Sequence, residues 1–305
     1  MLKTASNRLK ENIEFGSIGA YFSLLKPRVM SLAIFTALCG QILALKINIL
    51  HPILFLISLF SIAIGAGAAG CINMWYDRDI DAKMKRTKSR PIPSGIIKPD
   101  EALGLGIILS ILSVVLLGLA SNLLASFLLA SSILFYIFVY TMWLKRKSYY
   151  NIVIGGAAGA LPPLIGWVSV TNHISFFPII LFLIIFIWTP PHFWALSLFS
   201  ENDYEKAGIP MLPNVLGKKA TKKSIIKYSY FMYIISFLPY LLDYASDFYL
   251  VIMLILNTYF LYLAHQVDIN DHKTSKKLFK FSIIYLFLLF IAILADYFFQ
   301  FLLIK

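Results

Sequence analysis

Long apolar runs alternate with shorter polar connections along the chain, and this pattern predicts helices that cross a membrane. A helix needs about 20 consecutive apolar residues to span the hydrocarbon core of a bilayer. Runs of roughly that length cover residues 28–46, 52–74, 102–121, 123–143, 150–170, 175–196, 224–242, 246–265 and 280–302. Periodicity does not separate such runs from buried helices, but their length and number do. We therefore expect an all-α, polytopic membrane protein built as a bundle of nine transmembrane helices.

The composition favours a membrane protein over a soluble one. Of the 305 residues, 59% are hydrophobic and only 14% are charged, whereas a soluble domain carries about 25% charged residues. Cys39 and Cys71 both lie in apolar runs. Two cysteines in such positions are typical of small core residues and do not form a disulfide framework or a zinc pattern.

The basic residues predict the orientation of the bundle. Alternation of the nine spans places 25 of the 27 lysines and arginines on one side, and only Lys46 and Lys305 on the other. Lysine and arginine collect on the cytoplasmic side of membrane proteins, so we expect a cytoplasmic N-terminus and a periplasmic C-terminus. The net charge of +12 is then mainly a topology signal, and we expect no nucleic-acid partner.

The connections show where a site could be built. Those near residues 75–101 and 197–223 are long and lie on the cytoplasmic side, whereas every connection on the outside is short. We expect a cytoplasmic N-terminal tail over 1–27 and a single transmembrane domain over 28–305. The first 15 residues lack the apolar core of a signal peptide and contain Glu11 and Glu14, which are unusual in a mitochondrial presequence. A bacterial inner membrane is therefore the expected location.

An acidic cluster lies at the end of the second run. Asn73, Asp77 and Asp81 are spaced four residues apart and share one helical face. Oxygen ligands in this arrangement suit Mg²⁺, which binds one or two carboxylates together with phosphate oxygens and water. Arg86 and Arg90 repeat the spacing with groups that bind phosphate. An ordinary charged loop would explain the basic residues but not the acids, because acids contribute little to topology.

The stretch NMWYDRDIDAKMKRTKSRPIPSG resembles the first aspartate-rich motif of the UbiA superfamily of intramembrane prenyltransferases. Its pattern, N-D-x-x-D-x-x-x-D followed by R-x-x-x-R-P, matches this sequence at Asn73, Asp77, Asp81, Arg86 and Arg90. The resemblance implies that the first three residues are catalytic and hold Mg²⁺ on a prenyl diphosphate, which the two arginines bind. Residue 74 is a methionine where many members have an aspartate, which leaves one carboxylate fewer and the number of metal ions open. Asp79 lies off the shared face and is expected to be solvated.

A second stretch, WTPPHFWALSLFSENDYEKAGIPMLP, ends the sixth run. Pro190 and Pro191 predict a kink or a break in that helix. The stretch resembles the UbiA subfamily that farnesylates protohaem. Alignment on Gly208 puts Ser200 and Tyr204 at the aspartate positions of a second superfamily motif. Asp203, one residue out of register, is the acid that the resemblance retains for metal and substrate, while Glu201 and Glu205 stay unassigned.

His192 follows the two prolines. Without the resemblance, a hydrogen-bonded structural histidine is the first interpretation. With it, the imidazole is expected to be a catalytic and haem-binding group, either as an iron ligand or as a base near the haem vinyl group. No role is assigned to the remaining histidines, His51, His173, His265 and His272.

A third stretch, YTMWLKRKSYYNIVIGGAAGALPPLIGW, also resembles the superfamily. Lys145 and Arg146 could bind diphosphate or serve only as topology charges. The stretch also contains the glycines Gly155, Gly156, Gly159 and Gly166. Small residues of this kind let helices approach closely, and they could also leave space for a flat ligand.

Together the resemblances imply transfer of a farnesyl group from farnesyl diphosphate to the 2-vinyl group of protohaem IX, which gives haem O and diphosphate. Haem would be a substrate, Mg²⁺ the cofactor, and haem A synthase or oxidase assembly proteins the partners in the bilayer. The alternative enzyme is a sister prenyltransferase that acts on an aromatic acid or quinone precursor. A transporter would need ionisable groups near mid-membrane, but the acids here lie mostly at span ends, with Asp296 as the main exception. A purely structural oxidase-assembly protein would not need the face of Asn73 and the two aspartates.

Overall fold

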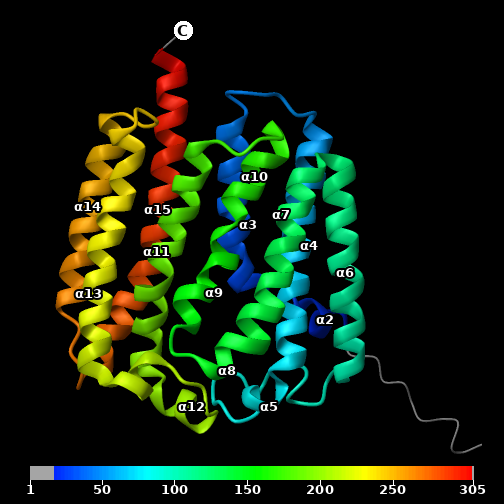
Figure 1. Ribbon diagram of the computed structural model, residues 1–305, viewed down its shortest axis with the longest axis vertical. Helices are drawn as coiled ribbons and strands as arrows, with labels where there is room; N and C mark the ends of the chain where they lie inside the picture. The colour runs from blue at the N-terminus through cyan, green and yellow to red at the C-terminus, as the bar shows by residue number, and fades with distance from the viewer. Residues whose placement is uncertain (1–16, 304–305) are drawn as a thin grey trace, which may run out of the picture.

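Each apolar run of the sequence is helical in the computed structural model, which describes residues 17–303 and holds no strand in that range (Figure 1). The first half comprises α2 (Ile18–Leu24), α3 (Pro27–Ala44), α4 (Pro52–Tyr76), α5 (Arg78–Asp81), α6 (Pro99–Ala120), α7 (Leu123–Leu134), the π-helix η1 (Phe135–Leu144) and α8 (Lys145–Lys147). The second half comprises α9 (Asn151–Ala160), α10 (Pro162–Thr171), α11 (Phe176–Phe199), α12 (Glu201–Lys206), α13 (Leu212–Leu241), α14 (Asp247–His265) and α15 (His272–Leu303). The long helices stand side by side as a bundle.

Eight helical segments in the described part of the chain are long and apolar enough to cross a membrane. Two of them join elements: α7, η1 and α8 form one, and α9 with α10 forms another. The ninth expected span, 224–242, lies within α13, which packs on α11 and α14 but is not among the eight. Gly217 turns the backbone inside α13, with φ at 82°, a conformation that glycine adopts readily. The all-α polytopic architecture is confirmed, with nine as an approximate count.

Glycines bring α3 and α10 into backbone contact. A Cβ on Gly166 would lie 2.1 Å from the carbonyl oxygen of Ala37, and a Cβ on Gly40 would lie 2.1 Å from that of Pro163. Small residues at such crossings allow the dispersion contacts that hold membrane helices together. The expected use of Gly166 in close helix approach is therefore confirmed.

Of the kink or break expected at Pro190 and Pro191, the break is wrong, because α11 continues through both residues, and the kink stays a prediction. Each proline removes one helical hydrogen bond, but α11 packs against α9, α13 and α15. These tertiary contacts hold the helix in place. His192 therefore sits on a regular helix and not at a broken end.

Buried polar groups connect the last three helices. Asn257 of α14 donates to the Ser236 hydroxyl of α13 at 2.9 Å and accepts from the Tyr285 hydroxyl of α15 at 3.0 Å. Asp296, 1% exposed, accepts from the Ser246 backbone N–H at 3.0 Å and from the Ser246 hydroxyl. Asp296 thus fixes α15 to the start of α14. Asp296 was the main exception to the pattern of acids at span ends. Its hydrogen bonds to Ser246 give it a structural role.

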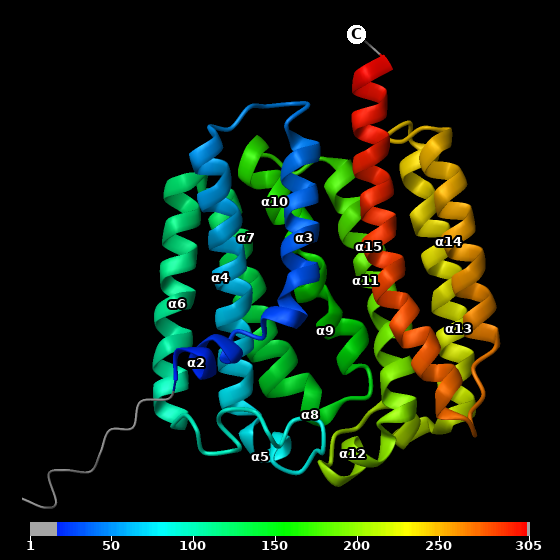
Figure 2. The ribbon, with the colours of Figure 1, turned by 180° about the vertical axis from the view of Figure 1, so that it is seen from behind.

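Two connections meet at one end of the bundle, where α5 and α12 lie next to each other (Figures 1 and 2). Their buried side chains form one apolar cluster, called the cap cluster here, which consists of Ile80, Met84, Ile152, Tyr204, Ala207, Ile209 and Met211. The described N-terminal residues contribute α2 near the same end, tied to α6 by the Tyr21 hydroxyl, which donates to Glu101 at 2.7 Å. The fold therefore closes this end, called the α5–α12 end, with side chains from three segments far apart in sequence. Residues 1–16 of the tail expected over 1–27 lie outside the described residues.

Candidate active site at the α5–α12 end

Asn73, Asp77 and Asp81 share one face because helical hydrogen bonding continues from α4 into α5. The Asp77 N–H donates to the Asn73 carbonyl at 2.9 Å, and the Asp81 N–H donates to the Asp77 carbonyl at 2.8 Å. The Asn73 amide also donates to the Asp77 carboxylate at 2.7 Å. Asp77 is fully buried and Asp81 is 2% exposed. The predicted spacing therefore yields two buried carboxylates and an amide on one line.

Basic side chains neutralise both carboxylates. Lys145 at the end of η1 pairs with Asp77, and Arg90 pairs with Asp81 at 2.6 Å. Charges buried in a low-dielectric region are tolerated when they are paired and hydrogen-bonded. The structure thus brings Arg90 and Lys145 to the acidic face, while their expected contact with diphosphate stays a prediction.

Arg146 makes a different contact from the one expected. Its guanidinium donates two hydrogen bonds to Asp79, at 2.7 and 2.9 Å, and lies 3.5 Å from Asp77. The Asp79 side chain is 55% exposed, so it is largely solvated as expected but also paired. The hydrogen bonds from Arg146 lower the pKa of the Asp79 carboxyl. Arg146 is therefore engaged at the rim of the site.

Lys26 belongs to the site although the sequence pattern does not single it out. Its ammonium donates to the Asn73 side-chain oxygen at 2.7 Å. The residue precedes α3 and adopts φ of 51°, a conformation that costs a non-glycine residue roughly 1–2 kcal/mol. Burial, followed by repulsion from Arg90 and Lys145, lowers the pKa of Lys26 to about 7. When Lys26 is protonated, three cations surround the two carboxylates, and an anionic ligand would favour that charged form.

Met74 does not take the place of the missing carboxylate in the site. It is 2% exposed and packs in an apolar cluster with Leu24 of α2, Cys71 and Ile97. Position 74 therefore contributes to the packing of α2 and lies off the face that carries Asn73. The cluster also gives Cys71 the core role expected for it.

Arg86 and Asp203 are not drawn into these pairs. Arg86 is exposed and forms no hydrogen bond or ion pair with another described residue. The Asp203 side chain is half-buried on α12 and likewise has no such partner within residues 17–303. The neighbouring Tyr204, at the position of a motif aspartate, points into the cap cluster. Glu201 is used elsewhere, in an ion pair with Lys218 at 2.7 Å.

The acidic face offers oxygen atoms of the kind that bind a divalent metal. The described residues hold no group of three histidine, cysteine or acidic side chains that could bind one. However, the Asp77 Oδ1 atom is buried without a hydrogen-bond partner, and unpaired buried oxygens are unusual. Two carboxylates and an amide oxygen fit Mg²⁺ that keeps water and substrate oxygens as its other ligands. The residues thus fit a magnesium–phosphate complex better than a cation held by protein alone.

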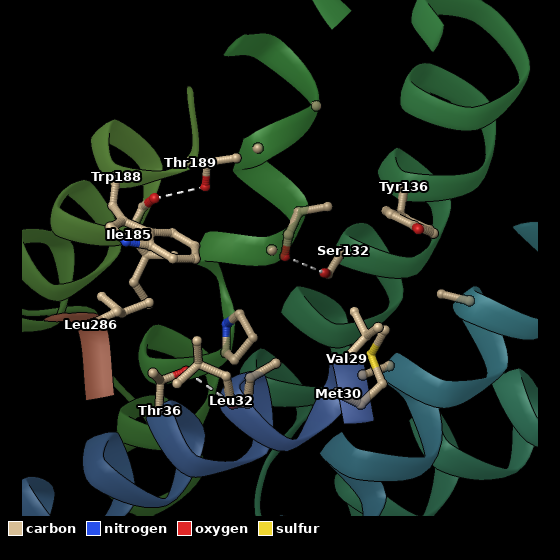
Figure 3. A pocket seen from close by; sticks show the side chains of 18 of the residues that line it. Val29, Met30, Leu32, Thr36, Ser132, Tyr136, Ile185, Trp188, Thr189 and Leu286 are labelled. Carbon is tan, nitrogen blue, oxygen red and sulfur yellow. Dashed lines mark hydrogen bonds between the residues drawn. The ribbon is translucent and has the colours of Figure 1, made fainter. Parts of the chain in front are cut away.

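A cavity of about 420 Å³ opens beside this site, between α3, α7, α9, α11 and α15. Figure 3 shows Ile185 and Trp188 of α11 on the opposite side from Ser132 and Tyr136, with residues of α3 below them. Most of the lining is apolar. A cavity of this kind suits an apolar ligand oriented by a few polar groups. Gly159 also lines it, and a Cβ there would meet no atom within 4 Å, so the expected space beside a glycine is present at this position.

The π-helix η1 links the cavity to the charged site. Tyr136 and Tyr140 line the cavity, Thr141 accepts from the Asn73 amide at 3.0 Å, and Lys145 follows at the end of the element. Hydrogen bonding in a π-helix runs from i to i+5, whereas an α-helix bonds i to i+4. The Lys145 N–H accordingly donates to the Tyr140 carbonyl, five residues earlier. Gly155 makes room, because a Cβ there would lie 2.1 Å from the Tyr140 ring.

His192 lies in the opposite wall of the same cavity. Its Nδ1 atom is 2.6 Å from the hydroxyl oxygen of Ser282 on α15, and its ring stacks on those of Trp188 and Phe279. It forms no contact with the acidic face among the interactions of the described residues. The cavity therefore has Tyr140, which belongs to the same η1 as Thr141, in its lining and a histidine on its α11–α15 wall.

Sequence comparisons relate this chain to a known family. Residues 33–294 match the model of the UbiA prenyltransferase family. "Protoheme IX farnesyltransferase 2" of Mesorhizobium japonicum is 54% identical over 91% of this chain and 90% of its own length. "Protoheme IX farnesyltransferase" of Acidiphilium cryptum is 49% identical over 95% and 94%.

Solved structures share the fold. One, of a digeranylgeranylglyceryl phosphate synthase, has a TM-score of 0.75 at 24% identity and covers 92% of this chain and 98% of that chain. Another, a UbiA homolog from Archaeoglobus fulgidus bound to DMAPP and Mg²⁺, has a TM-score of 0.65 at 19% identity and covers 88% and 98%. Fold and site thus define a multi-pass α-helical membrane protein with a cationic site beside an apolar cavity. The chain belongs to the UbiA prenyltransferase family.

Proposed function

We propose that this protein transfers the farnesyl group of farnesyl diphosphate to the 2-vinyl group of protohaem IX and forms haem O. Cleavage of the allylic C–O bond releases diphosphate. The vinyl group attacks the farnesyl cation, and addition of water completes the hydroxyethylfarnesyl side chain. The observation that carries the proposal is the continuity of the site: η1 lines the apolar cavity with Tyr136 and Tyr140 and contacts the acidic face through Thr141 and Lys145. Relatives at about 50% identity that carry this name support the acceptor.

In this proposal the diphosphate lies at the α5–α12 end. Lys26, Arg90 and Lys145 bind its oxygens, and the exposed Arg86 is free to reach it. Asn73, Asp77 and Asp81 would hold Mg²⁺, which, when bound, neutralises the charge that the leaving diphosphate gains. The prenyl diphosphate and Mg²⁺ bound to the Archaeoglobus fulgidus homolog support this assignment. Asp203 as a further ligand stays a prediction.

The apolar parts of the site protect the reaction from water. The cap cluster joins the two connections at the α5–α12 end. Tyr140 and Phe193, which line the cavity, pack against this cluster. An allylic cation reacts with any nearby nucleophile, so exclusion of bulk water favours the intended acceptor. His192 faces the acceptor side of the cavity. It is the group that we assign to haem.

The α5–α12 end would face the cytoplasm of a bacterial inner membrane, with the N-terminus cytoplasmic and the C-terminus periplasmic. The predicted placement of 25 of the 27 basic residues on one side of the membrane supports this orientation. Haem O would leave into the bilayer, where haem A synthase or oxidase assembly proteins are the proposed recipients.

The test uses the purified chain in lipid nanodiscs with haem, farnesyl diphosphate and MgCl₂, followed by mass analysis of the haems. We expect haem O from the natural chain and none from an Asp77→Asn variant. A parallel reaction contains an aromatic acid in place of haem. Prenylation of the aromatic acid without formation of haem O would favour the sister enzyme and contradict the proposal.

A further inference from the structure

The His192 ring is fixed in its plane by two aromatic neighbours. Its centroid lies 4.4 Å from that of Trp188, with 18° between the planes. It also lies 4.7 Å from the ring of Phe279, at 26°. The two stacked rings come from α11 and α15, so the helix pair holds the imidazole between them.

One edge is occupied by Ser282. The hydroxyl oxygen of Ser282 lies 2.6 Å from His192 Nδ1 and also 2.6 Å from the Phe279 carbonyl oxygen. A serine hydroxyl has a single proton, and the carbonyl can only accept, so that proton goes to Phe279. The hydroxyl oxygen must then accept from His192. The neutral imidazole is therefore the tautomer with its proton on Nδ1 and a lone pair on Nε2.

The Nε2 edge is left for a ligand. It makes no hydrogen bond to a residue within 17–303, and it is not among the buried polar atoms that lack a partner there. His192 lines the cavity. Two rings and one hydroxyl thus aim an unprotonated nitrogen at the space where an acceptor would bind.

We infer that Ser282 is a positioning residue that holds His192 Nε2 unprotonated toward the cavity, where it ligates the iron of a haem substrate. Histidines that bind metals commonly donate their other N–H to an oxygen, which fixes the tautomer and raises the basicity of the ligand. Ser282 provides such an oxygen. The identity of the metalloporphyrin rests on the proposed function, but the arrangement of Ser282 and His192 does not.

The experiment is an absorbance titration of ferric haem into the full chain in nanodiscs, without farnesyl diphosphate. Loss of an acceptor of this kind typically weakens metal binding by about 10–100-fold, and we expect a loss in that range for Ser282→Ala. Ser275→Ala is the matched control, because Ser275 is also buried on α15 and also donates to a carbonyl three residues earlier, that of His272 at 3.1 Å, but contacts no imidazole nitrogen within the described residues. It should bind haem like the natural chain.

The same titration in a His192→Ala background separates positioning from packing. In that background Ser282→Ala should cause no further loss of haem affinity. The His192→Ala substitution by itself should alter the absorption band of bound haem. A resonance Raman spectrum of the ferrous complex should show the iron–histidine stretch at lower frequency in Ser282→Ala. Equal losses in both backgrounds, or equal losses in the Ser282 and Ser275 variants, would overturn the inference. If haem binding depends on Ser282 but no haem O forms in the transfer assay, the proposed function fails and the inference stands.

Discussion

The ammonium of Lys26 donates a hydrogen bond to the side-chain oxygen of Asn73 at 2.7 Å, across 47 positions of sequence. This contact places a cation from the start of α3 at the acidic face of α4. Because Lys145 and Arg90 already pair with the two aspartates, the protonated form of Lys26 makes the site cationic overall. A site with that balance is expected to attract a diphosphate before the metal contacts are complete.

Lys26→Ala should therefore weaken the binding of farnesyl diphosphate more than it changes turnover. A hydrogen bond to a charged group contributes about 1.5–3 kcal/mol, so we expect KM for the diphosphate to rise by at least about 10-fold. Lys88→Ala is the control, since Lys88 is an exposed lysine of the connection between α4 and α6. An unchanged KM in Lys26→Ala, measured by initial rates in nanodiscs, would remove Lys26 from the diphosphate site.

Asp77→Asn should abolish transfer, and addition of EDTA to the natural chain should do the same. The variant leaves Lys145 buried without its ion partner, and breaking a buried pair in this way costs about 3–5 kcal/mol. We therefore expect a lower thermal midpoint as well. The double variant Asp77→Asn with Lys145→Met should regain much of the thermal midpoint but no activity. Recovery of transfer in the double variant would contradict the role of Asp77 in holding the metal.

Gly159→Leu should block the cavity and leave the fold intact. A side chain at this position points into open space along the cavity wall. Transfer is expected to fall steeply while the thermal midpoint stays near that of the natural chain. Gly166→Ala is the contrasting variant, because its Cβ would press on the Ala37 carbonyl. Overpacking of this kind typically costs about 1–3 kcal/mol, so its thermal midpoint should fall. If Gly159→Leu keeps full activity, the cavity is not where the substrates bind.

Asp296→Ala should lower stability without a specific effect on transfer. The carboxylate accepts two hydrogen bonds from Ser246 and one from Gln300 at 2.8 Å. Its loss leaves the buried N–H of the α14 start without an acceptor, at about 1–3 kcal/mol. Thermal unfolding of the purified protein measures this, and the activity per folded molecule at low temperature serves as the control. A large loss of turnover at unchanged stability would instead indicate a role for Asp296 in ligand passage.

Much of the fold is encoded locally. The apolar runs predict the helices to within a few residues at most ends, as at 52–74 against α4, because length and hydrophobicity are properties of contiguous sequence. The shared face of Asn73, Asp77 and Asp81 is equally local, since a helix places residues four apart on one side. Proline chemistry alone predicts a break at Pro190 that does not occur, because packing of α11 on its neighbours outweighs the lost hydrogen bonds.

Other features depend on contacts between distant segments. Lys26 reaches the site across 47 positions, Lys145 reaches Asp77 across 68, and Ser282 reaches His192 across 90. The sequence by itself determined the membrane helices, the basic end and the residue types of the proposed magnesium–diphosphate site. Only the tertiary structure decided that Arg146 binds Asp79, that position 74 packs against α2 and that Ser282 sets the tautomer of His192. Periodicity specifies one helix at a time, whereas the partners of a buried charge or a histidine depend on which helices pack together.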